Sequence, residues 1–219
     1  MNGPRLYLNA TNLSSGNMFF FVTGGGKPAE MGEHQLGVIT ADDYPLCKAV
    51  AASSAFPPVF PPLRLDSENY TCAEGEYVTL TDGGVYDNLG VNPLLRERND
   101  LDYVIVSDGG KPFGISERPT ESGIAVLFES ISILMEQVRG LQFKRLELAH
   151  LSGKGPKPLW FSIDSHIGEI QPGDANFASA ISTNLKKLST QEGAVLTRHA
   201  AALLKHRMET YARELLAAS

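Results

Sequence analysis

The sequence lacks clustered basic charge, which argues against a nucleic-acid binder. Its 219 residues include 19 Lys plus Arg and 25 Asp plus Glu, for a formal net charge of −6. Nucleic-acid affinity comes largely from neutralisation of phosphates by clustered Lys and Arg, and the chain contains no run of four basic residues. We therefore expect no nucleic-acid partner.

Long apolar runs and cysteines are also scarce. The longest strongly apolar run covers residues 19–22, whereas a bilayer-spanning helix needs roughly 20 residues. The first residues lack the apolar core of a secretion signal, so the expected location is cytoplasmic or at the periphery of a membrane. Two cysteines, Cys47 and Cys72, are too few for a disulfide framework, and neither has partners at zinc spacing. We predict reduced cysteines and no metal, nucleotide or redox cofactor.

The five histidines show no convincing metal-binding pattern. His199 and His206 lie one heptad apart on a predicted helix, but two ligands do not hold a zinc ion. We interpret the histidines as solvated or helix-capping side chains. The full set is His34, His150, His166, His199 and His206.

Segments typical of strands alternate with segments typical of helices. Apolar residues at spacings of three and four predict a short helix over 46–53 and a long one over 124–148, and Ser189 with Glu192 forms a capping box before a terminal helix. This alternation predicts an α/β fold with a largely parallel sheet. Strands are predicted at 5–10, 18–23, 76–81, 102–107 and 159–163.

Two Asp-Gly-Gly turns each follow a predicted strand, with Asp82 and Asp108 as their acids. An acid at the carboxyl end of a parallel strand faces the side where α/β proteins collect their active sites. Glycines after the acid allow a sharp turn with positive φ and leave room for a substrate. Because Asp-Gly is also a common turn pair, the residues alone leave a structural role open for both.

The sequence around Asp82 separates the two turns. Residues 51–62 read AASSAFPPVFPP and residues 81–91 read TDGGVYDNLGV. Together with LNATNL over 8–13 and the region from Ser189 onward, these segments resemble the C-terminal half of the patatin-like phospholipases. The resemblance spans roughly 5–202 and is most specific around Asp82. It implies a single partial domain over 1–219, with 203–219 as a helical tail.

The resemblance implies both a fold and a chemistry. The family fold is a three-layer α/β/α arrangement with a mainly parallel central sheet, here incomplete at its N-terminal side. Its members hydrolyse lipid acyl esters with a Ser–Asp dyad, in which the Ser lies in G-x-S-x-G and the Asp in D-G-[GA]. Asp82 then matches the dyad aspartate, with Gly83 and Gly84 as the active-site turn, and Asp108 becomes a structural residue at a strand end.

The matching nucleophile is absent from this sequence. No Ser has Gly at both i−2 and i+2, and Ser54 lacks the flanking glycines that an elbow needs. We therefore expect the C-terminal part of a lipid acyl hydrolase, inactive and poorly soluble alone, with Met1 marking a late start or a truncated frame. The alternative is a non-catalytic scaffold derived from this fold that binds lipid or protein.

Substrate and partners follow only from the resemblance. It implies a lipid or other acyl-ester substrate in the complete protein and transient contact with a membrane surface. Residues that would line an acyl groove are Phe56, Val59 and Phe60, with packing in the core as the alternative role.

Overall fold

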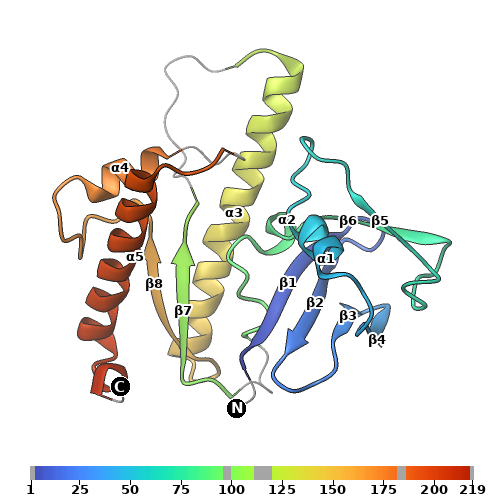
Figure 1. The fold of residues 1–219 in the computed structure, drawn as a ribbon, viewed down its shortest axis with the longest axis horizontal. Helices are drawn as coiled ribbons and strands as arrows, with labels where there is room; N and C mark the ends of the chain where they lie inside the picture. Colours follow the sequence, from blue (N-terminus) through green and yellow to red (C-terminus); the bar gives the residue numbers. More distant parts are fainter. Residues whose placement is uncertain (1–2, 96–99, 111–119, 182–185, 218–219) are drawn as a thin grey trace. The chain divides into compact units, whose positions relative to one another are not determined.

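The computed structural model describes residues 3–95, 100–110, 120–181 and 186–217 (Figure 1). Within these residues the chain divides into two units. Unit 1 comprises Met1–Pro93 and Thr120–Phe143, and unit 2 comprises Leu94–Pro119 and Lys144–Ser219.

Unit 1 is built on a six-stranded sheet with the order β4-β3-β2-β1-β6-β5. All five strand pairs in this sheet are antiparallel. Short loops join β1 to β2, β2 to β3 and β3 to β4, which is the usual connection between antiparallel neighbours. The strands are β1 (Arg5–Asn12), β2 (Met18–Gly24), β3 (Glu30–Glu33), β4 (Gly37–Thr40), β5 (Leu63–Asp66) and β6 (Tyr77–Asp82).

The prediction of a three-layer α/β/α fold with a mainly parallel central sheet was wrong. Among the described residues, the one parallel pair joins β7 (Tyr103–Asp108) to β8 (Lys157–Ser162) in a separate two-stranded sheet. A parallel pair needs a crossover of about a dozen residues or more. The connections between the first four strands are too short for this, and three of the strands, β3, β4 and β5, were not predicted.

One face of the six-stranded sheet carries the core of unit 1. Phe19, Phe21 and Leu80 are buried there, and Phe19 packs edge-on against the ring of Tyr70 at 5.1 Å between centroids. Burying one such aromatic side chain stabilises a fold by about 1.5–3 kcal/mol. This face therefore supplies much of the stability of the sheet.

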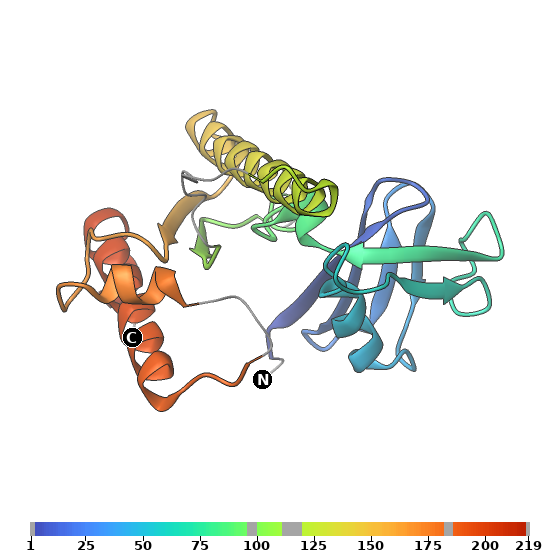
Figure 2. The ribbon, with the colours of Figure 1, turned by 90° about the horizontal axis from the view of Figure 1, so that it is seen from above.

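Helix α1 (Leu46–Ser53) lies against this core face (Figure 2). Its buried residues are Ala49 and Ala52, whose small side chains let the helix approach the sheet closely. The helix ends where predicted, before the prolines at 57 and 58, because proline removes a backbone donor and clashes with the preceding turn. Its C-terminal end thereby comes to lie beside the end of β6.

A buried carboxylate anchors the turn between β1 and β2. The Glu33 side chain is fully buried, and it accepts hydrogen bonds from Asn12 Nδ2 at 2.8 Å, Ser15 Oγ at 2.7 Å and Asn17 Nδ2 at 3.2 Å. The same turn carries Leu13, whose backbone N–H donates to the Thr79 carbonyl at 2.9 Å. The position of Leu13 is thus fixed from two sides.

Unit 2 contains the β7–β8 pair, the C-terminal end of α3 and helices α4 to α6. Its buried residues include Val104 and Val106 of β7 and Leu159 of β8. The predicted capping box is confirmed: Ser189 Oγ accepts from Glu192 N, and the Glu192 carboxylate accepts from Ser189 N. The helices are α3 (Gly123–Leu151, which begins in unit 1), α4 (Asp174–Ala180), α5 (Thr190–Tyr211) and α6 (Glu214–Ala217).

Candidate functional site

Asp82 is the last residue of β6 and is held by backbone contacts on two sides. It pairs with Ala10 of β1, and its carbonyl accepts the hydroxyl of Thr11 at 2.9 Å. Its N–H donates to the carbonyl of Ala55 at 3.1 Å, and the same carbonyl accepts the Thr81 hydroxyl at 2.8 Å. The backbone of Asp82, from which the carboxylate side chain projects, is therefore fixed by β1 and by the residues that follow α1.

The Asp82 carboxylate is half-buried, neither packed into the core nor free in solvent. Among the described residues, the one hydrogen bond that it accepts comes from the N–H of Gly84, to Oδ1 at 2.7 Å. Burial raises the pKa of Asp82 above its ordinary value, and the Gly84 N–H opposes part of this increase. A carboxylate with a raised pKa is a stronger base, and the limited hydrogen bonding leaves it able to accept a further proton donor.

The space around the two glycines after Asp82 is limited, most strictly at Gly83. A Cβ on Gly83 would lie 2.3 Å from the carbonyl oxygen of Asn9 in β1, and a Cβ on Gly84 would lie 2.8 Å from the Met135 methyl group and 3.0 Å from Asp82 Oδ1. The expected positive φ is wrong: Gly83 has φ −63° and ψ −28° and begins α2 (Gly84–Asp87). Close approach of the β1 backbone explains Gly83, whereas the neighbours of Gly84 are side-chain atoms.

The second Asp-Gly-Gly turn repeats the local geometry in a different environment. Asp108 ends β7, and its Oδ1 accepts from the N–H of Gly110 at 3.1 Å, as Asp82 accepts from Gly84. The Asp108 side chain is buried, however, with 4% of its surface exposed. A substrate reaches a half-buried carboxylate more readily than a buried one. Accessibility therefore favours Asp82 over Asp108 as the carboxylate of a functional site.

The serines near Asp82 make other contacts. Ser54, the substitute nucleophile considered above, donates its hydroxyl to the carbonyl of Val50 at 2.7 Å. Ser53 approaches the turn only through its backbone carbonyl, which accepts from Gly83 N at 3.3 Å. In the part of the chain that the structure describes, no serine hydroxyl is hydrogen-bonded to the Asp82 carboxylate.

An apolar groove of about 560 Å³ adjoins the turn that follows Asp82. Val59 and Phe60, two of the three residues considered for an acyl groove, line it and are exposed. Leu13, which lines the groove, and Thr11, which donates to the Asp82 carbonyl, could not be identified from the sequence, because their roles depend on tertiary contacts that no local pattern signals. The lining consists of Leu13, Pro57, Pro58, Val59, Phe60, Pro61, Pro62, Thr81 and Val85.

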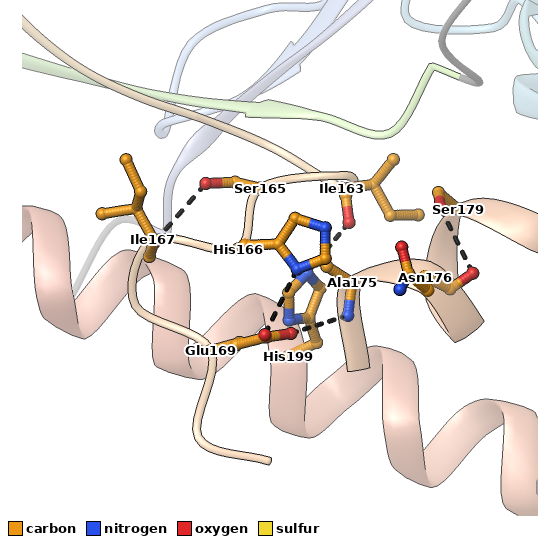
Figure 3. Close-up of polar contacts among 9 residues, drawn as sticks. All are labelled: Ile163, Ser165, His166, Ile167, Glu169, Ala175, Asn176, Ser179 and His199. Atoms are coloured by element: carbon orange, nitrogen blue, oxygen red, sulfur yellow. Dashed lines mark hydrogen bonds and ion pairs between the residues drawn. The ribbon is translucent and has the colours of Figure 1, made fainter. Parts of the chain in front are cut away.

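A second polar cluster lies in unit 2, where His166 is paired with a carboxylate (Figure 3). Its Nδ1 lies 3.2 Å from Glu169 Oε1, and Glu169 Oε2 accepts from the N–H of Ala175 in the first turn of α4 at 3.1 Å. The Ala175 N–H, followed by His166, lowers the pKa of Glu169. Glu169 thus connects the loop after β8 to the start of α4.

His199 lies below His166 in Figure 3 and belongs to the same cluster. It is buried rather than solvated, contrary to the prediction for the histidines, and its Nε2 lies 2.9 Å from the Ile163 carbonyl. That carbonyl can only accept, so Nε2 is the donor. The hydroxyls of Ser165 and Ser179 contact the backbone carbonyls of Ile167 and Asn176. The drawn contacts therefore do not form a Ser–His pair.

No metal site is apparent in the described ranges. No group of three or more His, Cys, Asp or Glu residues there is arranged to hold a metal ion. In the same residues, no helix combines the length and the apolar character needed to cross a membrane. Cys47 and Cys72 are both free thiols.

Comparison with known proteins gives one family match. The model of the patatin-like phospholipase family matches residues 8–95, a segment that begins within β1, continues through β6 and includes Asp82. A search of curated proteins found no match. Over residues 8–95 the chain is therefore similar to the patatin-like phospholipases. The wider extent over 5–202 and the assignment to the C-terminal half of the family's domain stay predictions.

Proposed function

We propose that this chain supplies Asp82 as the general base of a Ser–Asp lipid acyl hydrolase, an enzyme that hydrolyses carboxylic esters in lipid degradation. The observation that carries this proposal is the half-buried Asp82 carboxylate, with its raised pKa and its single described donor. The family match over 8–95 supports the class of reaction. Gly83 and Gly84 form the turn that presents the carboxylate.

The proposed reaction needs a serine that this sequence does not hold in a G-x-S-x-G frame. The serine oxygen attacks the ester carbonyl carbon while Asp82 accepts the hydroxyl proton. The tetrahedral intermediate then expels the alcohol, which takes up that proton. Water next attacks the acyl-enzyme, again with Asp82 as base, and releases the fatty acid and the free serine. Donors that stabilise the oxyanion must accompany the serine.

The test combines this chain with a segment that carries the nucleophile elbow, supplied by the upstream reading frame or as a second polypeptide. Hydrolysis of p-nitrophenyl esters is the readout. Asp82→Asn should lower kcat by about 10³-fold or more, because removing a member of a catalytic unit typically costs this much. Asp108→Asn, in the matched turn of β7, should retain most of the activity once its folding is verified.

A second candidate function is a non-catalytic scaffold that binds lipid or protein. It is favoured by the contacts of Ser54, whose hydroxyl donates to Val50 rather than to Asp82. If the combined polypeptides gain no esterase activity, the scaffold becomes the better account. Retention of full hydrolysis by Asp82→Asn in an active combination would refute the role proposed for Asp82.

A further inference from the structure

The apolar groove shares a segment of chain with the candidate base. Thr81 directly precedes Asp82, and Val85 lies three residues after it; both line the groove. The wall of the groove and the Asp82 carboxylate therefore belong to the same strand end and turn. An apolar group held in the groove would keep an attached polar group close to this turn.

The groove offers little to polar ligands. None of its lining residues is charged, and the sequence from Ser53 to Leu63 has no ionisable side chain. Its one polar side chain, Thr81, already donates its hydroxyl to the Ala55 carbonyl at 2.8 Å. The exposed fractions of Val59 and Phe60 are 56% and 41%, so these side chains are not core residues. An apolar ligand would remove this surface from water.

The walls of the groove are conformationally restricted. Four prolines lie within residues 57–62; their φ angles are fixed and they have no N–H to donate. The backbone N–H of Phe60 donates to the carbonyl of Phe56 at 2.9 Å, which closes the proline segment on itself. Leu13, another lining residue, is carried by the turn that Glu33 anchors. Binding would require little further ordering, which favours affinity.

We infer that this groove holds the hydrocarbon chain of the acyl ester, with its carbonyl directed to Asp82. This inference rests on the function proposed above. The volume of about 560 Å³ falls in the range of about 300–1,000 Å³ that is typical of small-ligand pockets. A stable protein partner would need an interface of about 1,200–2,000 Å², which a groove with nine lining residues does not provide.

The test is binding of neutral straight-chain alcohols from hexanol to dodecanol to the 219-residue chain, by displacement of an environment-sensitive fluorescent fatty acid. Each methylene buried is worth about 0.8 kcal/mol, so affinity should rise about fourfold per carbon until the groove is full. Val59→Asp and Phe60→Asp should each weaken dodecanol binding about tenfold or more, because a carboxylate in an apolar groove is costly to desolvate. Val38→Asp, at a similarly exposed apolar residue of β4, is the matched control and should change affinity less than about twofold.

Equal affinity of the parent chain and both groove variants would overturn the inference, as would an equal loss in Val38→Asp. Sedimentation with phosphatidylcholine vesicles tests another occupant. If Val59→Asp abolishes vesicle binding while alcohol affinity is unchanged, the groove rim contacts membranes and the inference is wrong. The assay involves no chemistry, so its failure is distinguishable from failure of the proposed function. In that case Asp82→Asn still abolishes hydrolysis by the combined polypeptides, although the groove does not bind acyl chains.

Discussion

Replacement of Gly83 by alanine tests whether close packing on β1 positions Asp82. The added Cβ would lie 2.3 Å from the carbonyl oxygen and 2.8 Å from the carbonyl carbon of Asn9. The shorter distance is about 1 Å inside ordinary van der Waals contact. Both atoms belong to a strand that is paired on each side, so they cannot move without disturbing the ladder. The backbone angles at Gly83 are allowed for alanine, and the cost is therefore one of space.

The expected cost follows from overpacking. Inserting a methyl group where backbone must give way costs about 1–3 kcal/mol, and the upper part of this range applies because the contacts are backbone atoms. Gly→Ala also reduces the conformational entropy of the unfolded chain, which by itself stabilises the folded state by about 0.4–1 kcal/mol. We expect a net loss of about 2 kcal/mol, which corresponds to a decrease in Tm of about 4–8 °C for a chain of this size.

The measurement must report on the unfolding of unit 1, which contains Gly83. Trp160, the sole tryptophan, belongs to β8 in unit 2, so its fluorescence would report on the other unit. Hydrogen exchange of peptides from β1 and β6 is specific, and a loss of about 2 kcal/mol accelerates exchange through the opened state about thirtyfold. Gly109→Ala is the matched control, because a Cβ there meets nothing within 4 Å. If Gly83→Ala exchanges no faster than Gly109→Ala, the packing argument is refuted.

Two further predictions concern buried or half-buried carboxylates in unit 1. Because burial raises the folded-state pKa of Asp82, its charged form opposes folding, and its contribution to stability is lost as pH rises through that pKa. The stability of Asp82→Asn relative to the parent, measured by urea unfolding, should thus increase between about pH 3 and 7; a constant or decreasing difference would contradict the shift. Glu33→Ala should cost about 3 kcal/mol in the same assay, since it leaves Asn12 Nδ2 and Ser15 Oγ without their acceptor and removes one of the two acceptors of Asn17 Nδ2. The exposed Glu74→Ala should change stability by less than about 0.5 kcal/mol, and an equal loss in both variants would refute a special role for Glu33.

The sequence was informative where a local pattern determines structure. Helical spacing predicted α1 and α3, and the Ser189–Glu192 pair predicted the start of α5, because helix formation and capping depend on residues three or four positions apart. The segment around Asp82 resembled the patatin-like phospholipases, and the family model matches residues 8–95. These features need no knowledge of distant contacts.

The sequence was misleading about the sheet. Alternation of strands and helices suggested parallel pairing, but strands β3, β4 and β5 have only four residues each and carry too weak a pattern to be recognised. Strand direction depends on which segments pair, and the hydrogen bonds that decide this join residues far apart in the chain. His199 shows the same limit: its burial depends on packing of α5 near the Ile163 carbonyl, which its sequence neighbours do not encode.

The sequence by itself determined that an acid followed by two glycines ends a strand, and that four prolines make the segment 57–62 stiff and apolar. Only the tertiary structure decided that Gly83 is needed where the chain approaches Asn9 closely, that Asp82 is half-buried while Asp108 is buried, and that Leu13 lines the same groove as the proline segment. The physical reason is that turn chemistry and backbone stiffness are local, whereas desolvation and close packing depend on side chains brought together from distant parts of the chain.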